Sequence, residues 1–436
     1  MLRLAVVLSL LAGAPAAARA AGGDRAPPDG AWREAPVDLE RYFAPGEVEA
    51  WRSFRDRHRL AGLVALGLDL ATCLLFLGGP GRWLWLRLSR RRDRPSGRAG
   101  RLLARVLGPD WRAALVFACA YFAVGVALDL PLSIWHELLN REVGLSTTTA
   151  GLWALDFLKG LTVGAVLFTL LVTGLYGLVR RFPRSFWLIL ALPVALVTVA
   201  YAVVGPYGTR LYHDVRPLES TRHADPALVE RLRRLARTGG VSLAQIKVTD
   251  TSRRSRALGA YLAGVGPSRE LVLSDTLLDG ATADEIAVVV AHELGHHDDG
   301  EHAVLLLAVL GLVALLGLLS LVLRAGARLM RLDGPGHMRT LPLVGLTALL
   351  LFNLALPLRN ARSRERERRA DRHALVLTGD PEAFISIQVK LARRNREDVA
   401  PSRWVELWYF GHPPAVERIG AALWYRGWLE RRAGDR

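Results

Sequence analysis

The sequence has little cysteine and almost no lysine. Its two cysteines, Cys73 and Cys119, lie in separate apolar segments without the spacing of a metal-binding pair, which excludes a disulfide framework and a cysteine-ligated zinc site. Only three of the 57 basic residues are lysine, and the other 54 are arginine. Many of these arginines flank apolar segments, where they favour a role in membrane topology and lipid contact over nucleic-acid binding.

Apolar residues are abundant by contrast. The 436 residues are 51% hydrophobic with a mean hydropathy of +0.22, although the net charge is +16. This balance is typical of a multispanning membrane protein and not of a soluble enzyme. Six apolar segments have the length needed to span a membrane: roughly 60–79, 113–135, 155–179, 186–204, 303–323 and 341–358. We therefore expect a mainly α-helical fold built on polytopic membrane helices in a lipid bilayer.

The first 20 residues allow two interpretations. Arg3, a short apolar run and the small residues up to Ala20 are typical of a secretory signal peptide. Alternatively, this segment is an uncleaved membrane helix, which would come first in the chain and bring the number of spans to seven. Residues 21–59 form a polar region, predicted to be mostly loop with a short amphipathic helix at Pro45–Phe54. Residues 60–204 hold the first four spans.

A polar domain is predicted at residues 205–302. Pro226–Arg237 is expected to form an amphipathic helix capped by Asp225, and Gln245–Thr249 and Glu270–Ser274 are expected to form strands. Ala283–His297 is expected to be a helix. The chain then forms a membrane hairpin at 303–358 and returns to a C-terminal region, 359–436, that begins with a charged helix at Arg362–Leu377.

The helix at Ala283–His297 contains a His-Glu-x-x-His motif. His292 and His296 are four residues apart and share one helix face, so both imidazoles can bind one Zn²⁺. Glu293 lies beside them and can take a proton from a metal-bound water. Alone, this five-residue pattern also occurs by chance on ordinary helices.

A third protein ligand is expected from the charged helix that follows the last span. Glu367 and Asp371 are four residues apart, so Glu367 can bind the metal while Asp371 supports a histidine ligand from behind. Glu365 is a rival ligand that spacing alone does not exclude. A run this charged is otherwise typical of a solvated helix face.

These motifs together resemble those of a known family. The His-Glu-Leu-Gly-His core, an apolar hairpin and the segment Ser363-Arg-Glu-Arg-Glu-Arg-Arg-Ala-Asp371 look like the type I CAAX prenyl endopeptidases and the related bacterial heat-shock membrane proteases. The resemblance extends to Arg216–Glu219, Leu271–Leu278 and His412–Ile419. It covers about residues 205–425 well, and the first four spans only by their layout.

The resemblance implies an integral-membrane zinc metalloendopeptidase of the gluzincin type, with membrane helices around a chamber that an α+β zinc domain caps. His292, His296 and Glu367 match the zinc ligands, Glu293 the catalytic base and Asp371 the supporting acid. His412 and Arg418 are placed near the site, where either can stabilise an oxyanion or simply belong to a loop–helix junction.

The resemblance also implies that an edge strand before the motif binds a peptide or protein substrate by backbone pairing. The family has Asn-Ala-Tyr at this strand, and the chain has Gly259-Ala260-Tyr261. The loss of the asparagine side chain puts any substrate contact at that position in doubt, but it does not affect the zinc chemistry.

The side of the membrane on which the zinc domain lies stays open. Arginines concentrate in the loops 82–112, 180–184 and 324–340, whereas the loop 136–154 holds only Arg141. Basic short loops stay inside, which favours a zinc domain facing outward, into a periplasm. The resemblance implies the cytosolic side instead. Because arginine is used so heavily and the start resembles a signal peptide, we expect a bacterial inner membrane.

Two further alternatives concern function. Within proteases, a bacterial source favours quality control or processing of membrane proteins over cleavage of prenylated C-termini. Outside enzymes, the chain could be a channel, transporter or scaffold that keeps a structural metal site. A structural site fills all four zinc positions with protein ligands, whereas a catalytic one leaves a position for water.

Overall fold

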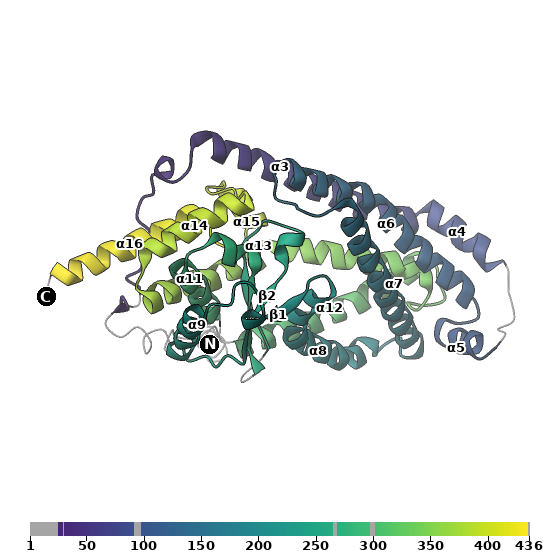
Figure 1. The fold of residues 1–436 in the computed structure, drawn as a ribbon. Helices are drawn as coiled ribbons and strands as arrows, with labels where there is room; N and C mark the ends of the chain where they lie inside the picture. The colour runs from purple at the N-terminus through teal and green to yellow at the C-terminus, as the bar shows by residue number, and fades with distance from the viewer. Residues whose placement is uncertain (1–24, 29, 91–96, 265–267, 297–300, 435–436) are drawn as a thin grey trace.

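The computed structural model describes residues 25–28, 30–90, 97–264, 268–296 and 301–434, and for 198–206, 301–305, 307 and 308 the backbone alone. The signal peptide or first membrane helix expected at residues 1–20 lies outside the described residues. Helices dominate the fold, and one small sheet lies between the membrane helices and the C-terminal helices (Figure 1). The expected fold class, mainly α-helical with an α+β domain beside membrane helices, is confirmed.

Five helices in the described part are long and apolar enough to cross a membrane. They are α3 (Pro45–Leu77), α6 (Trp111–Glu142), α7 (Ala150–Arg181), α12 (Glu301–Leu329) and α13 (Leu341–Thr378). A sixth apolar helix, α8 (Phe186–Val204), packs against α12. Their apolar side chains are widely exposed, as expected of surfaces that face lipid.

Two helices are longer than the sequence predicted. The short helix expected at Pro45–Phe54 continues without a break into the first span as α3, and the charged helix expected at Arg362–Leu377 is the second half of α13. The charged residues at each junction predict a helix boundary there. Arginine is a good helix former, however, and no glycine interrupts either junction, so the backbone continues.

The zinc domain is built on a four-stranded sheet with the order β1-β2-β4-β3. The strands are β1 (Val215–Pro217), β2 (Gln245–Thr249), β3 (Ala260–Ala263) and β4 (Glu270–Ser274). β2 and β4 are parallel, as their separation by a crossover requires, while β1 and β3 are antiparallel edge strands. Both predicted strands have the expected bounds. The helix α9 (Pro226–Thr238) also forms as predicted, with the Asp225 side chain accepting a hydrogen bond from the Ala227 amide at 2.9 Å.

The remaining helices enclose the core of this domain. They are α10 (Asp275–Gly280), α11 (Ala283–Gly295), α14 (Pro381–Asn395), α15 (Arg403–Tyr409) and α16 (Ala415–Gly434). Residues 30–43 also pack here, since the Trp32 ring stacks on Tyr425 at 5.4 Å and the Ala35 amide donates to the Gly420 carbonyl. The chain segment before the first span therefore lies on the same end of the molecule as the zinc domain.

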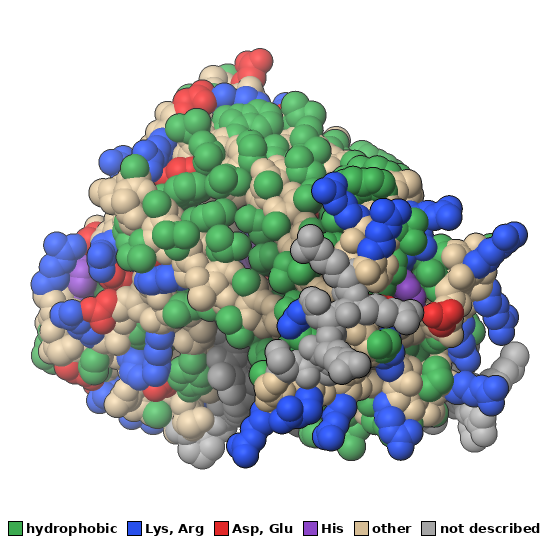
Figure 2. Space-filling model, turned by 90° about the vertical axis from the view of Figure 1, so that its right-hand side faces the viewer, with side chains coloured by type: hydrophobic (Ala, Val, Ile, Leu, Met, Phe, Trp, Pro, Cys, Tyr) green, Lys and Arg blue, Asp and Glu red, His purple; other side chains and the backbone are tan. Residues whose placement is uncertain are grey.

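The opposite end of the molecule holds α4 (Gly79–Ser89), α5 (Gly97–Leu107) and the turn before α13, which includes the 3₁₀ helix η8 (Met338–Thr340) (Figure 1). The side chain of Arg180, at the end of α7, passes close to Gly108 and Gly336. The three arginine-rich loops are thus gathered at one end, away from the His-Glu-x-x-His motif. Figure 2 views the molecule from this end and shows basic side chains around apolar surface.

Candidate functional site

The helix α11 presents the motif because both its start and its buried face are well defined. Thr282 caps it, with its hydroxyl accepting from the Glu285 amide at 3.3 Å and its own amide donating to the Glu285 carboxylate at 2.7 Å. Ile286, Val290 and Leu294 recur every four residues and are buried. The helix is therefore fixed to the core on one side, and the two histidines project from its other side.

A close approach between α11 and α13 brings the third candidate ligand to the motif. Gly295 lies against α13 so tightly that a β-carbon added to it would meet the Ala370 Cα at 2.9 Å and the His373 side chain at 3.0 Å. His373 also donates a hydrogen bond from Nδ1 to the carbonyl of Ala291 at 3.2 Å. Small residues at this crossing thus set the distance between the two helices.

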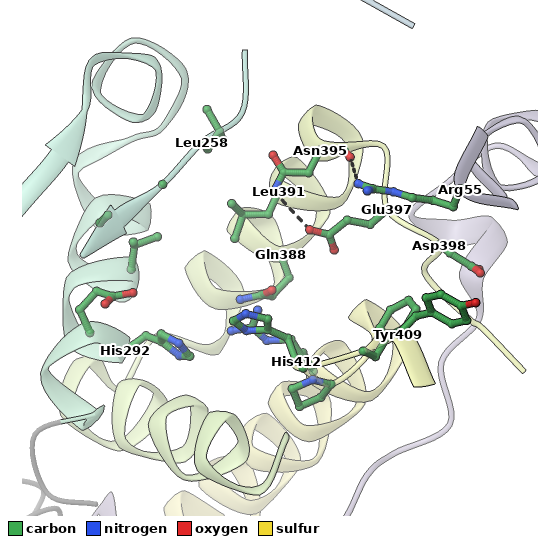
Figure 3. A pocket seen from close by; sticks show the side chains of 18 of the residues that line it. Arg55, Leu258, His292, Gln388, Leu391, Asn395, Glu397, Asp398, Tyr409 and His412 are labelled. Atoms are coloured by element: carbon green, nitrogen blue, oxygen red, sulfur yellow. Dashed lines mark hydrogen bonds between the residues drawn. The ribbon is translucent and has the colours of Figure 1, made fainter. Parts of the chain in front are cut away.

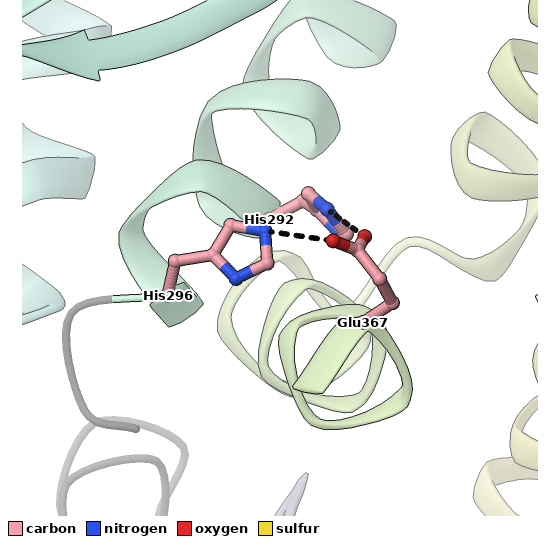
Figure 4. A group of neighbouring side chains, drawn as sticks. All are labelled: His292, His296 and Glu367. Atoms are coloured by element: carbon pink, nitrogen blue, oxygen red, sulfur yellow. Dashed lines mark ion pairs between the residues drawn. The ribbon is translucent and has the colours of Figure 1, made fainter. Parts of the chain in front are cut away.

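Three ligand atoms converge at this crossing (Figure 4). His292 Nε2 lies 3.1 Å from Glu367 Oε2, and His296 Nε2 lies 3.5 Å from Glu367 Oε1. All three potential ligand atoms lie within 4.8 Å of one another. Glu367 is only 7% exposed, so its carboxylate is directed to the histidines and not to solvent.

Glu365 is directed elsewhere. Its carboxylate pairs with Arg368 at 3.6 Å and with Arg369 at 3.4 Å along the surface of α13. The spacing of the charged helix left Glu365 and Glu367 open as ligands, and the helix geometry brings only Glu367 toward the histidines.

Asp371 holds His292 from behind. The Nδ1–H of His292 donates to Asp371 Oδ1 at 2.9 Å, which directs Nε2 at Glu367 and makes Nε2 the nitrogen that can bind a metal. Arg418 in turn donates two hydrogen bonds to the same carboxylate, at 2.9 and 2.5 Å. Burial lowers the pKa of Arg418, but the charge and hydrogen bonds of Asp371 outweigh it and raise that pKa above its usual value. Arg418 is therefore engaged in supporting Asp371.

The donor set fits a zinc ion. Two imidazole nitrogens and one carboxylate are the ligands of a catalytic zinc site with one open position. Glu367 Oε2 is buried without a hydrogen bond of suitable geometry, although the His292 and His412 rings approach it. A ring nitrogen and a carboxylate oxygen 3.1 Å apart are held together by a cation between them, which is a proton in the absence of metal and can be replaced by a metal ion. The three residues therefore fit a bound zinc ion.

Without a metal ion, burial affects the two histidines and Glu293 differently. Burial lowers the pKa of His292, but hydrogen bonds to Asp371 and Glu367 outweigh it and raise the pKa to about 9. Burial and the neighbouring His292 lower the pKa of His296 to about 4. Burial raises the pKa of Glu293 to about 7, close to the value that suits a general base at neutral pH.

A cavity of about 640 Å³ adjoins the motif (Figure 3). His292 and Glu293 line one wall, Gln388 and Leu391 of α14 line another, and Tyr409 follows from α15. The strand-edge residues Leu258, Gly259 and Ala260 and the α3 residues Arg55 and His58 complete it. The residues from α3, α14 and α15 had no sequence signal, because they are remote in the chain and their types are common in helix faces.

His412 lies at the mouth of this cavity. Its ring is 68% exposed, and Nδ1 lies 2.9 Å from Glu367 Oε2. His412 and Arg418, both expected near the site, therefore occupy different places. His412 faces the cavity beside the ligands, whereas the guanidinium of Arg418 is held by Asp371.

The strand β3 forms the free edge of the sheet next to the motif. Both backbone groups of Gly259 point toward β4, where its amide donates to the Ser274 hydroxyl and its carbonyl accepts from the Ser274 amide. Ala260 follows on the cavity wall, with Leu273 as its partner on the inner side of the sheet. The position at which the resembled family has asparagine is thus a glycine that belongs to the sheet.

Comparison with known proteins agrees with this geometry. The model of peptidase family M48 matches residues 222–425, which include all the candidate ligands, and the model of the CAAX prenyl protease N-terminal region, described as five membrane helices, matches residues 35–208. An uncharacterized metalloprotease, YhfN, of Bacillus subtilis is 29% identical over 303 residues, covering 67% of this chain and 69% of its own. CAAX prenyl protease 1 of Saccharomyces cerevisiae is 30% identical over 185 residues, covering 42% of this chain and 40% of its own.

A solved structure has the same fold. The crystal structure of S. mikatae Ste24p superposes with a TM-score of 0.74 at 20% identity and covers 96% of both chains. The shared fold therefore includes the membrane helices as well as the domain with the His-Glu-x-x-His motif.

Proposed function

The chain is an integral-membrane metalloprotease of peptidase family M48 with the membrane region of the CAAX prenyl proteases, and we propose that it is a zinc endopeptidase acting on membrane-associated proteins. One observation supports this most strongly. The three candidate ligands converge beside a cavity that His292 and Glu293 line, and this cavity is large enough for several residues of an extended peptide. A structural metal site in a channel or scaffold would not need such a cavity.

The proposed reaction is hydrolysis of a peptide bond. Zinc, when bound by His292, His296 and Glu367, polarises the scissile carbonyl and lowers the pKa of the attacking water. Glu293 takes the proton of that water and delivers it to the leaving amine. Its position one residue after a ligand places its carboxylate at the cavity wall, and its partial burial keeps its pKa near neutrality.

We assign different roles to His412 and Arg418. His412 lies at the cavity mouth with Nδ1 directed at Glu367, so its Nε2 is free to donate a hydrogen bond to the developing oxyanion. Arg418 acts through Asp371, since its guanidinium donates two hydrogen bonds to that carboxylate. Asp371 then fixes the ring of His292 in the orientation that binds the metal.

The substrate backbone is proposed to pair with the free edge of β3. Ala260 and Glu293 line the same cavity. On its inner side Ala260 is paired with Leu273 of β4, so only its outer side is open to an added strand. An added strand along this edge would carry a scissile bond past the motif. Because the amide and carbonyl of Gly259 already bond to Ser274, we assign the pairing to the outward backbone groups of the next residue, Ala260, and not to a side-chain amide at position 259.

We propose membrane-protein quality control or processing as the setting. CAAX prenyl protease 1 is the name of several relatives, but prenylated C-termini are not expected in a bacterium, the source that the arginine-rich composition indicates. Unfolded segments of membrane-associated proteins are suitable substrates, because they can enter the cavity and pair with β3 in an extended form.

We further propose that the zinc domain lies outside the cytoplasm of a bacterial inner membrane. The arginine-rich loops 82–112, 180–184 and 324–340 are gathered at the end remote from the motif, as cytoplasmic loops would be. Two arginines at the motif end, close to the start of the first span, have carboxylate partners. Arg57 pairs with Glu142 at 2.8 Å, and Arg59 pairs with Asp398 at 2.8 Å.

Labelling in intact cells tests this orientation. In a chain with Cys73→Ala and Cys119→Ala, Glu430→Cys near the C-terminus should react with a membrane-impermeant maleimide, and Arg101→Cys should not. Labelling of the Arg101 position alone would place the zinc domain in the cytoplasm.

Metal removal tests the proposed activity. Purified full-length protein in mild detergent should cleave an unstructured fluorogenic peptide internally, lose that cleavage on treatment with a chelator and regain it with stoichiometric zinc. Cleavage that survives complete removal of the metal would exclude the zinc mechanism, whereas release of single terminal residues would exclude an endopeptidase.

A further inference from the structure

A second cavity lies at the opposite end of the membrane helices. It has a volume of about 420 Å³ and lies where α7 ends, between α4, the start of α6 and the turn before η8. Trp85 and Tyr176 line its inner part, and Arg180, His337, Asp110 and Asp333 supply its charged and polar groups. The ends of membrane helices lie at the level of lipid headgroups, so this cavity faces the region that headgroups occupy.

Arg180 is placed in this cavity by two glycines. A β-carbon on Gly108 would meet the Arg180 guanidinium at 2.1 Å, and a β-carbon on Gly336 would meet its Cγ at 2.5 Å. Both loops thus leave a slot that the arginine side chain fills. Among the described residues no ion pair or side-chain hydrogen bond engages Arg180, so the structure holds a guanidinium in place without an anion.

His337 offers a donor beside it. Its Nδ1 accepts a hydrogen bond from the Arg339 amide at 3.2 Å, so the neutral ring carries its proton on Nε2. Burial and the neighbouring Arg339 lower the pKa of His337, which favours this neutral form. The ring also packs on Trp85 with centroids 4.6 Å apart, which fixes its orientation. Arg180 and His337 together can hold a phosphate group.

Two carboxylates complete the charge pattern. Asp110 and Asp333 line the same cavity, and within the described part of the chain neither side chain forms an ion pair or hydrogen bond. A simple anion would be repelled by them. A ligand that carries a phosphate and an ammonium group matches both pairs of residues.

An apolar crevice continues from the cavity between α5, α6 and α7. Leu107 and Met338 line both, and Leu115, Phe168 and Val172 line the crevice further along α6 and α7. Its walls are almost entirely apolar side chains, and its volume of about 10 Å³ is too small for an acyl chain, so it extends the apolar surroundings of the cavity toward the lipid-facing helices.

We propose that this cavity binds an ethanolamine phospholipid, with its phosphate on Arg180 and His337, its ammonium on Asp110 and Asp333, and its acyl chains along the exposed apolar faces of α6 and α7. The ammonium of ethanolamine has three N–H donors for the carboxylates, whereas the trimethylammonium of choline has none. The site should therefore distinguish phosphatidylethanolamine from phosphatidylcholine, and both from the anionic phosphatidylglycerol.

Native mass spectrometry of the full-length protein in mild detergent tests this directly. With equal amounts of the three phospholipids added, the wild type should retain phosphatidylethanolamine at least about tenfold better than the other two, as hydrogen bonds to charged groups imply. Arg180→Gln should lose at least about tenfold of that binding. Arg181→Gln, the matched control on the adjacent residue outside the cavity lining, should retain it.

A second variant separates the two halves of the headgroup. Asp110→Asn combined with Asp333→Asn should remove the preference for ethanolamine over choline, because the ammonium partners lose their charge. Arg180→Lys keeps the cation and should bind at an intermediate level, and unchanged melting temperatures in detergent would show that each variant is folded.

Three results would overturn the proposal. The first is equal retention of phosphatidylethanolamine by Arg180→Gln and the wild type. The second is a preference of the wild type for phosphatidylglycerol. The third is displacement of the lipid by soluble O-phosphoethanolamine at equal concentration, because the acyl chain would then contribute nothing.

Discussion

His292 Nδ1 lies 2.9 Å from Asp371 Oδ1, although 79 residues and a membrane hairpin separate the two in the chain. The contact joins α11 to α13 behind the metal ligands, so the orientation of one ligand depends on a residue beyond the last span. Asp371→Asn keeps the shape of the side chain and removes its charge. We expect zinc affinity to fall by about 10- to 100-fold, the usual effect of losing such a partner.

Competition with a zinc-chelating dye measures this affinity. Glu365→Gln is the matched control, because its carboxylate lies on the same helix and pairs only with neighbouring arginines. An Asp371→Asn protein with the zinc affinity of the wild type would refute the supporting role of Asp371.

The identity of the third ligand gives a second prediction. Glu367→Ala removes the carboxylate that faces both histidines, so the purified protein should contain less than one zinc per chain and should not cleave peptides. Glu365→Ala should keep both zinc and activity. Elemental analysis of the two proteins after identical purification distinguishes them, and the reverse result would assign the ligand to Glu365.

The pH dependence follows from the burial of Glu293. Its pKa is raised to about 7 without metal, and a bound cation beside it lowers that pKa. A general base must be deprotonated, so kcat/KM should be constant above this pKa and fall about tenfold per pH unit below it. The midpoint is expected at or below pH 7.

The zinc content must be measured at each pH, since protonation of the ligands also ends activity. Only the decline at full zinc occupancy reports on the base. A decline at full zinc occupancy with its midpoint above pH 7 would contradict the assignment of Glu293 as the base.

Gly295 gives a test of the helix crossing that forms the site. Gly295→Ala would place its β-carbon 2.9 Å from the Ala370 backbone, so α11 and α13 must separate. We expect a loss of about 1–3 kcal/mol in unfolding free energy, typical of overpacking, together with weaker zinc binding.

Gly311→Ala is the matched control for this substitution. Gly311 lies in the helix α12 with open space at its β-carbon position, so alanine there should be neutral or stabilise by roughly 0.5–1 kcal/mol. Thermal unfolding in detergent compares the two. Equal melting temperatures for both variants would show that the crossing tolerates a wider separation.

Much of this architecture could be predicted from the sequence because its signals are local. The alternation in β2, the short apolar run of β4, the Asp225 cap of α9 and the apolar length of the spans each depend on a few neighbouring residues. The His-Glu-x-x-His motif belongs to the same class, since helical spacing alone places His292 and His296 on one face.

What the sequence left open depends on contacts between remote segments. The choice between Glu365 and Glu367 is decided by how α13 is rotated against α11, and that rotation depends on Gly295 packing at Ala370. Arg418 was expected near the site, but its engagement with Asp371 required the fold. The cavity residues Gln388 and Tyr409 come from helices whose composition is ordinary.

The most direct test of the central claim is Glu293→Gln in purified, full-length protein. Glutamine keeps the size of the side chain but cannot accept the proton of the attacking water. We predict one zinc per chain, as in the wild type, and peptide cleavage reduced at least about a hundredfold, as loss of a general base implies. Wild-type cleavage by the zinc-loaded Glu293→Gln protein would contradict the assignment of this site as the active site of a metalloprotease.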